Sequence, residues 1–229
     1  KDEQCCVFAS ELKAILRFLE RRLVLDPIAI DQYFARGYIL SPRTIFKDIH
    51  KLPAGCSLTL NADSWEHAIA SYWDYSPVEV PSDPGKAIDQ LDELLSDAVR
   101  KRLISDVPFG CLLSGGIDST LMTAMAAKTM GKGQLKTFSI GFDSDDPRFN
   151  ELPYAKMTAE HHHCQWNSKV VELGDFLELV DDVSDYFDEP FANFAMFPMR
   201  RLAQLCREQL TVVLSGQGGD ELSAGYEGR

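Results

Sequence analysis

The sequence has no apolar run long enough to cross a membrane and no excess of positive charge. Its 229 residues include 23 Lys and Arg against 35 Asp and Glu, a formal net charge of −12. Nucleic-acid backbones are held mainly by Lys and Arg, so this balance argues against a general nucleic-acid binder. The lack of a run of about eighteen apolar residues likewise argues against a membrane protein. A single nucleotide stays open as a ligand, because backbone amides, a helix N-terminus and a metal ion can hold its phosphates.

Cysteine pairs are also lacking. The six cysteines are Cys5, Cys6, Cys56, Cys111, Cys164 and Cys206, and they form neither a zinc-ribbon pattern nor a disulfide framework. We interpret them as reduced thiols that fill apolar space in a cytoplasmic protein. The histidines at 161–163 beside Cys164 suggest a metal cluster, but adjacent ligands on one element diverge. A solvated helix end is the simpler interpretation.

The first part of the chain contains mostly short runs of residues that favour β-strands. Apolar spacing predicts one helix over Glu11–Arg22. The β-like runs lie at 44–46, 57–60 and 69–73 and are separated by proline and glycine. Residues 77–85 hold three prolines, a glycine and acidic residues, which is typical of a linker.

From residue 86 onward, predicted strands and helices alternate. The helices are expected at 86–103, 119–130, 152–162, 175–186 and 198–208, and the strands at 110–113, 136–142, 168–171 and 210–214. This alternation predicts an α/β fold in which a parallel sheet is flanked by helices. Ligands of such sheets bind beyond the carboxyl ends of the strands. The loops to consider therefore follow Leu113, Ile140 and Leu214.

The first of these loops has a pattern suited to an anion. Its residues are Ser114-Gly115-Gly116-Ile117-Asp118-Ser119-Thr120, directly between a strand and a helix. Adjacent glycines let the backbone approach a ligand, and the free amides of the helix N-terminus face the same point. Asp118 would repel a phosphate unless a cation lies between them, so we expect Mg²⁺ there. The alternative is a tight turn in which Asp118 or Ser119 caps the helix.

A second glycine-rich loop follows the strand that ends at residue 214. It is Ser215-Gly216-Gln217-Gly218-Gly219-Asp220-Glu221, and it supplies a carboxylate from another strand end. Because the carboxyl ends of parallel strands share one edge of the sheet, we expect Asp118 and Asp220 to hold one Mg²⁺ ion together. The alternative is a glycine-rich surface loop without function.

These two loops carry a family resemblance. The first resembles the SGGxDS pyrophosphate-binding loop of ATP pyrophosphatases and differs from a Walker A loop, whose GxxxxGK[ST] pattern is not in the chain. The second, followed by Gly225-Tyr226, resembles the SGxGxDE…GY segment of glutamine-dependent asparagine synthetases. Weaker matches lie at 8–14, 44–55, 72–74 and 137–142 and at the DEPF stretch, 188–191.

The resemblance implies an ATP-pyrophosphatase domain of the adenine-nucleotide α-hydrolase type. Residues 1–76 would be the C-terminal part of a β-rich N-terminal nucleophile glutaminase domain, 77–85 a linker, and 86–229 the synthetase domain. Such an enzyme adenylates aspartate or a related carboxylate with ATP and Mg²⁺, releases pyrophosphate, and forms an amide with ammonia taken from glutamine. The resemblance is also compatible with a homodimer.

Residue roles follow from the matched motifs. The adenine site would be lined by Leu112, Ile140 and Gly141. Pyrophosphate and metal would be held by Ser114, Gly115, Gly116, Asp118 and Ser119, with Ser215 and Gly216 on the nucleotide. Asp118 and Asp220 would be metal ligands, and Asp118, Asp220 and Gln217 the catalytic set. Glu189 would serve either in the site or as a local cap or ion-pair partner.

The chain also departs from the family pattern. The N-terminal catalytic cysteine of the family and the catalytic lysine beyond the GY pair have no counterpart here, so we expect a chain truncated at both ends. Gln217 stands where the family often has an acidic residue, and a neutral amide cannot act as a general base. Two alternatives therefore stay open: a ring-forming homologue of the β-lactam synthetase or lasso-peptide cyclase type, and a catalytically silent scaffold.

Overall fold

The chain forms two compact units. The structure, a computed structural model, describes residues 5–19, 22–143, 150–172, 174, 177–180, 186–223 and 225. One unit comprises Lys1–Glu79 with Asp181–Phe194, and the other Val80–Val180 with Ala195–Arg229. The chain therefore passes between the units three times, after Glu79, Val180 and Phe194. The sequence predicted a boundary near residue 80, but it did not predict that residues 181–194 belong to the first unit.

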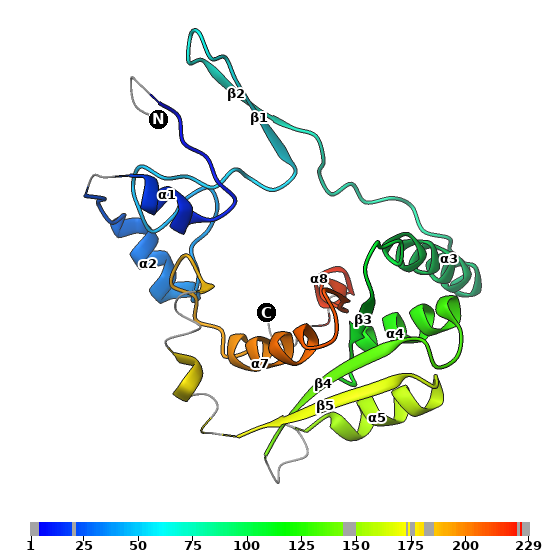
Figure 1. The fold of residues 1–229 in the computed structure, drawn as a ribbon. Helices are drawn as coiled ribbons and strands as arrows, with labels where there is room; N and C mark the ends of the chain where they lie inside the picture. Colours follow the sequence, from blue (N-terminus) through cyan, green and yellow to red (C-terminus); the bar gives the residue numbers. More distant parts are fainter. Residues whose placement is uncertain are drawn as a thin grey trace. The chain divides into compact units, whose positions relative to one another are not determined.

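The described part of the first unit is formed by helices α1 and α2 and a β-hairpin (Figure 1). The helices are α1 (Leu12–Phe18) and α2 (Pro27–Arg36), and the hairpin pairs β1 (Cys56–Leu60) with β2 (His67–Ser71) in antiparallel register. Helix α2 was not predicted. Its signals are nevertheless in the sequence, because Asp26 accepts a hydrogen bond from the Ile28 amide at 3.0 Å, a proline begins the helix, and Gly37 ends it at φ 81°.

Two predictions for this unit need correction. The first helix ends at Phe18, short of the predicted Arg22, because Leu19 is extended; residues 20–21 lie outside the described part. The predicted strand at 44–46 takes part only in an isolated bridge between Leu25 and Phe46. The Thr44 hydroxyl explains this, since it donates to the backbone oxygens of Phe46 and Ile49 at 3.0 and 2.8 Å and competes with a ladder.

The second unit is built on a four-stranded parallel sheet, as predicted. Its strands are β3 (Phe109–Leu112), β4 (Lys136–Phe142), β5 (Gln165–Val171) and β6 (Val212–Leu214), in the spatial order β5-β4-β3-β6. Each neighbouring pair is parallel, with Cys111 opposite both Thr137 and Leu214. The predicted strand after the third helix begins three residues earlier than expected, at Gln165.

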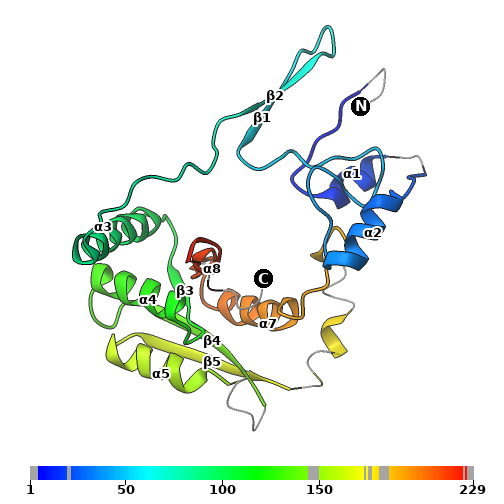
Figure 2. The same cartoon turned by 180° about the vertical axis from the view of Figure 1, so that it is seen from behind.

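Helices cover both faces of this sheet (Figures 1 and 2). They are α3 (Pro84–Arg102), α4 (Ile117–Met130), α5 (Leu152–His161), α7 (Met196–Arg207) and the short α8 (Gly219–Ser223). Helices α3, α4 and α5 pack on the face that carries Cys111 and Leu113, whereas α7 packs against Phe138 on the other face. Pro84 and Gly85, predicted as linker, form the first turn of α3, which Asp83 caps. Most of the predicted helix 175–186 lies outside the described residues.

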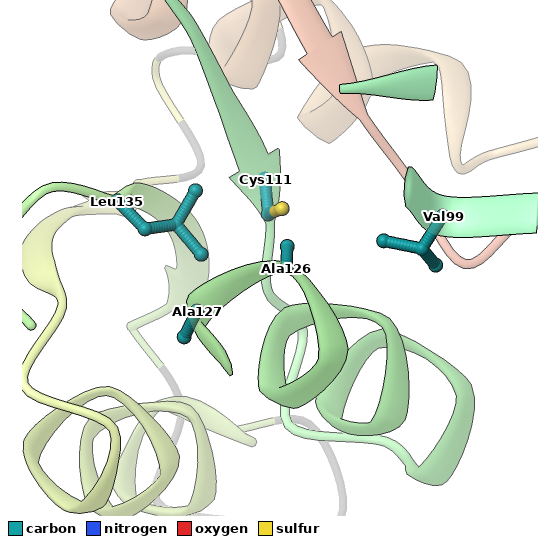
Figure 3. Close-up of a cluster of buried hydrophobic side chains, with 5 residues drawn as sticks. All are labelled: Val99, Cys111, Ala126, Ala127 and Leu135. Atoms are coloured by element: carbon teal, nitrogen blue, oxygen red, sulfur yellow. The ribbon is translucent and has the colours of Figure 1, made fainter. Parts of the chain in front are cut away.

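Small side chains bring α4 close to the sheet. Ala126 is fully buried and Ala127 nearly so, and they pack against Cys111 and Leu135 together with Val99 of α3. Figure 3 shows Val99 and Leu135 on either side of Cys111 and Ala126. This close packing fixes the C-terminal half of α4 against β3, the strand from which the first glycine-rich loop leads into this helix. Among the described residues, no helix has both the length and the apolar composition needed to cross a membrane.

Candidate active site

The sheet reverses its direction of winding between β3 and β6. From β3 the chain proceeds through α4 to β4 and through α5 to β5, whereas α7 leads it to β6 on the opposite side of β3. The two connecting helices, α4 and α7, lie on opposite faces. A crevice opens beyond the carboxyl ends of two such strands, and it is the usual ligand site of open α/β sheets. Both glycine-rich loops, after β3 and after β6, are at this point.

The loop after β3 is shaped by its first glycine. Gly115 has φ 101°, and a Cβ there would lie 2.8 Å from the Glu151 backbone oxygen and 3.0 Å from the Ala155 amide nitrogen. The backbone of α5 therefore leaves no room for a side chain. Helix α4 begins at Ile117 with Gly116 as its N-cap and no side-chain cap. The alternative with Asp118 or Ser119 as the cap is wrong, because both lie inside the first turn.

Hydroxyl groups hold this loop together. Ser119 is buried, and its Oγ accepts from the Ser114 amide at 3.2 Å and donates to the Gly116 oxygen at 3.1 Å. The two serine hydroxyls lie 2.9 Å apart, and the Gly116 amide donates to the Ser114 Oγ at 3.2 Å. Ser119 thus orders the loop from its buried side, while Ser114 is exposed, and the first-turn amides of α4 have no partner within the helix itself.

The loop after β6 packs directly against Asp118. A Cβ on Gly216 would lie 2.8 Å from the Ser119 amide nitrogen and 2.9 Å from the Asp118 carbonyl carbon. A Cβ on Gly219 would overlap the Asp118 carboxylate itself. The absence of side chains at Gly216 and Gly219 is what allows the two loops to meet. Gln217 is exposed at the tip of this loop, and its backbone N–H donates to the Ser215 Oγ at 3.4 Å.

The carboxylates at this meeting point suit a hard cation. Asp118 and Asp220 are half-buried, and Asp220 lies in the first turn of α8. Within the described ranges, no three His, Cys, Asp or Glu side chains gather as a complete metal site. The chain would therefore supply one or two carboxylates, which is the usual number for Mg²⁺ bound to nucleotide phosphates. The donor set next to α4 fits this ion.

The predicted adenine-site residues divide between the two faces of the sheet. Leu112 and Ile140 are half-buried and pack with Phe138 on the α7 face. Gly141 is buried, and a Cβ there would lie 2.6 Å from Leu152 Cγ at the start of α5. The close approach of Leu152 requires a glycine at this position, and the role of the three residues in binding adenine stays a prediction.

Comparison with known proteins identifies the family. Residues 90–229 match the family model for asparagine synthase, and residues 1–73 match a glutamine amidotransferase domain. The chain belongs to the asparagine synthase family.

Named relatives extend over nearly the whole chain. A putative glutamine-hydrolysing asparagine synthetase of Methanocaldococcus jannaschii is 38% identical over 225 residues, 96% of this chain and 42% of the relative. Glutamine-hydrolysing asparagine synthetase 1 of Bacillus subtilis is 31% identical over 221 residues, 96% of this chain and 34% of the relative. A solved glutamine-dependent NAD⁺ synthetase of Acinetobacter baumannii, in complex with ADP, is 20% identical with a TM-score of 0.45 and covers 73% of this chain and 31% of that one. The chain spans less than half the length of the two curated relatives.

In this member of the asparagine synthase family, a buried serine that the sequence analysis missed supports the first loop. The Ser139 Oγ donates to the Leu113 backbone oxygen at 2.7 Å and accepts from Trp166 Nε1 at 2.8 Å. Leu113 in turn donates its amide to the Phe138 oxygen at 2.8 Å. The residue just before Ser114 is thus fixed from two sides. The sequence contained one signal for this role, which is a serine between apolar residues of a predicted strand.

Replacing Ser139 with alanine should lower the free energy of unfolding by about 1–3 kcal/mol, because the buried Leu113 oxygen and the partly buried Trp166 N–H would both lose this partner. Urea denaturation of the variant and the parent measures the change. Ser168→Ala, at an exposed position of β5, is the matched control and should change little. Equal midpoints for Ser139→Ala and the parent would show that the hydroxyl does not support the loop.

The cysteines are structural residues, and so are the adjacent histidines, which suggested a metal cluster in the sequence. All six cysteines are free thiols, and burial raises the pKa of Cys111 to about 12 and that of Cys206 to about 11. These two thiols stay neutral near pH 7 and pack as apolar groups. The three adjacent histidines lie at the C-terminal end of α5, which ends at His161, as the simpler interpretation predicted.

Proposed function

We propose that this chain contains the adenylating half of a glutamine-dependent amide ligase of the asparagine synthetase type. In this reaction the carboxylate of aspartate or a related acid attacks the α-phosphate of ATP, and pyrophosphate leaves. Ammonia from glutamine then attacks the acyl adenylate, so an amide forms and AMP is released. The observation that carries the proposal is the packing of Gly216 and Gly219 on Asp118, which brings two family motifs to one switch point.

Each part of the site has a task in this reaction. The first-turn amides of α4 and the Ser114 hydroxyl would bind the departing pyrophosphate. Leu112 and Ile140 would hold the base on the α7 face. Asp118 and Asp220 would hold Mg²⁺, which when bound neutralises phosphate charge. Glutamine-derived ammonia would come from the amidotransferase portion, part of which is residues 1–73, and the free thiols fit a cytoplasmic enzyme.

The proposal is tested by ATP–pyrophosphate exchange in the full-length protein. Exchange should depend on a carboxylic acid, with aspartate the most effective in a panel of amino-acid and β-amino-acid carboxylates. Amide formation from the same acid and ammonia completes the test. Exchange with an acid that then forms a ring would support the ring-forming alternative. No exchange with any acid would leave the scaffold alternative and overturn the proposal.

Gln217→Glu is expected to change the rate of amide formation by about tenfold or more and the rate of ATP–pyrophosphate exchange much less. The side chain lies exposed at the loop tip, and glutamate there could accept a proton from the attacking amine, which glutamine cannot. Steady-state rates of both half-reactions measure the ratio. Gln134→Glu, at an exposed position in another turn, is the control. Equal effects on both half-reactions would instead place Gln217 in nucleotide binding.

A further inference from the structure

The DEPF segment lies within the first unit, although the chain around it belongs to the second. Residues 186–194 lie between β5 and α7 in the sequence but belong to the same compact unit as the N-terminal part of the chain. The rings of Phe187 and Phe191 stack with centroids 5.4 Å apart and close the turn between them. This turn presents two adjacent carboxylates, Asp188 and Glu189, whose side chains are only 22% and 15% exposed.

Asp188 caps a helix that begins 176 residues earlier in the chain. Its two carboxylate oxygens accept from the backbone amides of Leu12 at 2.5 Å and Lys13 at 3.4 Å, the first two residues of α1. Glu11, the local N-cap residue, makes no side-chain cap. The Lys13 ammonium lies 3.6 Å from the same carboxylate and donates to the Tyr186 oxygen at 3.2 Å. A carboxylate at this helix end also complements the helix dipole.

Glu189 and Ala192 hold two further loops of the first unit. One Glu189 oxygen accepts from the Ile45 amide at 2.6 Å, and the other pairs with the Lys51 ammonium at 2.5 Å. The Ala192 amide donates to the oxygen of Gly37 at 2.7 Å. Four residues after Ala192, α7 begins, and α7 leads through β6 into the loop that packs on Asp118.

We propose that Asp188 and Glu189 are positioning residues, an anchor that holds the DEPF segment against α1 and the loop at Ile45 within the amidotransferase-side unit. The anchor orders that unit for the use of glutamine as the nitrogen source and has no part in adenylation. Each of the four carboxylate oxygens has a partner in the first unit, so both side chains are held by that unit. This role rests on the proposed amide-ligase function.

The test compares nitrogen sources in the full-length protein. In Asp188→Ala and Glu189→Ala, glutamine-dependent amide formation should fall by about tenfold or more, as a small misplacement of reacting parts can cost this much. Ammonia-dependent amide formation and ATP–pyrophosphate exchange should stay within about twofold. Asp188→Asn should restore part of the glutamine-dependent rate, because its one oxygen can still accept from the Leu12 amide, whereas its NH2 group cannot accept from Lys13. Glu160→Gln, in an exposed ion pair of α5, is the control. Equal loss with both nitrogen sources, or no loss with either, would overturn the role.

A second measurement does not depend on the reaction. Hydrogen exchange at the Leu12 and Ile45 amides should become faster in Asp188→Ala and Glu189→Ala respectively, while the amides of β4 keep their protection. Unchanged exchange at both amides would overturn the anchor itself. If the parent protein shows no pyrophosphate exchange, the proposed function fails, and the anchor is still judged by these amides.

Discussion

Replacing Asp118 with asparagine should reduce Mg²⁺-dependent pyrophosphate release by on the order of 10²-fold or more while leaving the protein folded. The carboxylate lies in the first turn of α4, against Gly216 and Gly219, where the phosphates of ATP would approach. Asparagine keeps the size of the side chain but loses the charge that holds the cation. The cost in stability should be small, about 0.3–1 kcal/mol, because only the favourable interaction with the helix N-terminus is lost.

The measurement is pyrophosphate release as a function of Mg²⁺ concentration, together with thermal unfolding. Asp92→Asn removes an exposed carboxylate from α3 and should alter neither. An unchanged Mg²⁺ dependence in Asp118→Asn would show that the metal is held elsewhere. A loss of activity accompanied by a large fall in Tm would show that Asp118 is a structural residue of the helix.

Alanine at the two glycines that contact Asp118 should have different effects. At Gly216, the added Cβ would lie under 3.0 Å from backbone atoms of Asp118 and Ser119, which cannot yield without moving α4. Gly216→Ala should therefore lose about 1–3 kcal/mol of stability as well as activity. At Gly219, the three atoms nearest to the added Cβ would all belong to the Asp118 carboxylate, which is the end of a side chain. Gly219→Ala should keep its stability and lose on the order of 10²-fold in pyrophosphate release, because that carboxylate is displaced.

Denaturant unfolding and pyrophosphate release, measured on both variants, separate these effects. Gly174→Ala is the control, since a Cβ there would have no neighbour within 4 Å. The close approach of the two loops would be contradicted if Gly216→Ala matched the parent in both assays. A fully active Gly219→Ala would show that the Asp118 carboxylate is not needed where the structure places it.

The alternation of strands and helices predicted the parallel sheet well because each element carries its own periodicity. The sequence also indicated that both glycine-rich loops occupy one edge of that sheet. It did not indicate that β3 and β6 are neighbours, which depends on α7 crossing to the other face. The contact between Gly216 and Asp118 follows from that crossing, and a reading of either loop alone could not predict it.

Other features were out of reach for a similar reason. Ser139 acts through partners on two other strand regions, Leu113 and Trp166, so its own sequence neighbours say little about it. Glu189 could be described from the sequence only as a site residue or a local partner. Its actual partners, Ile45 and Lys51, lie more than 130 residues away in the chain. Contacts of such separation come from tertiary structure alone.

The late arrival of Asp188 has a consequence for synthesis on the ribosome. Its partner Leu12 emerges 176 residues earlier. At about 5–20 residues per second, the first helix therefore waits on the order of 10–35 s for its cap. During that interval the amides of Leu12 and Ile45 lack their carboxylate acceptors, and Lys51 lacks its ion-pair partner Glu189. The strands β3 and β4 of the second unit can pair before the first unit is complete. A chain that ended at Glu79 would lack Asp188, the residue that caps α1. The first unit can therefore be completed only after most of the second unit has been synthesised.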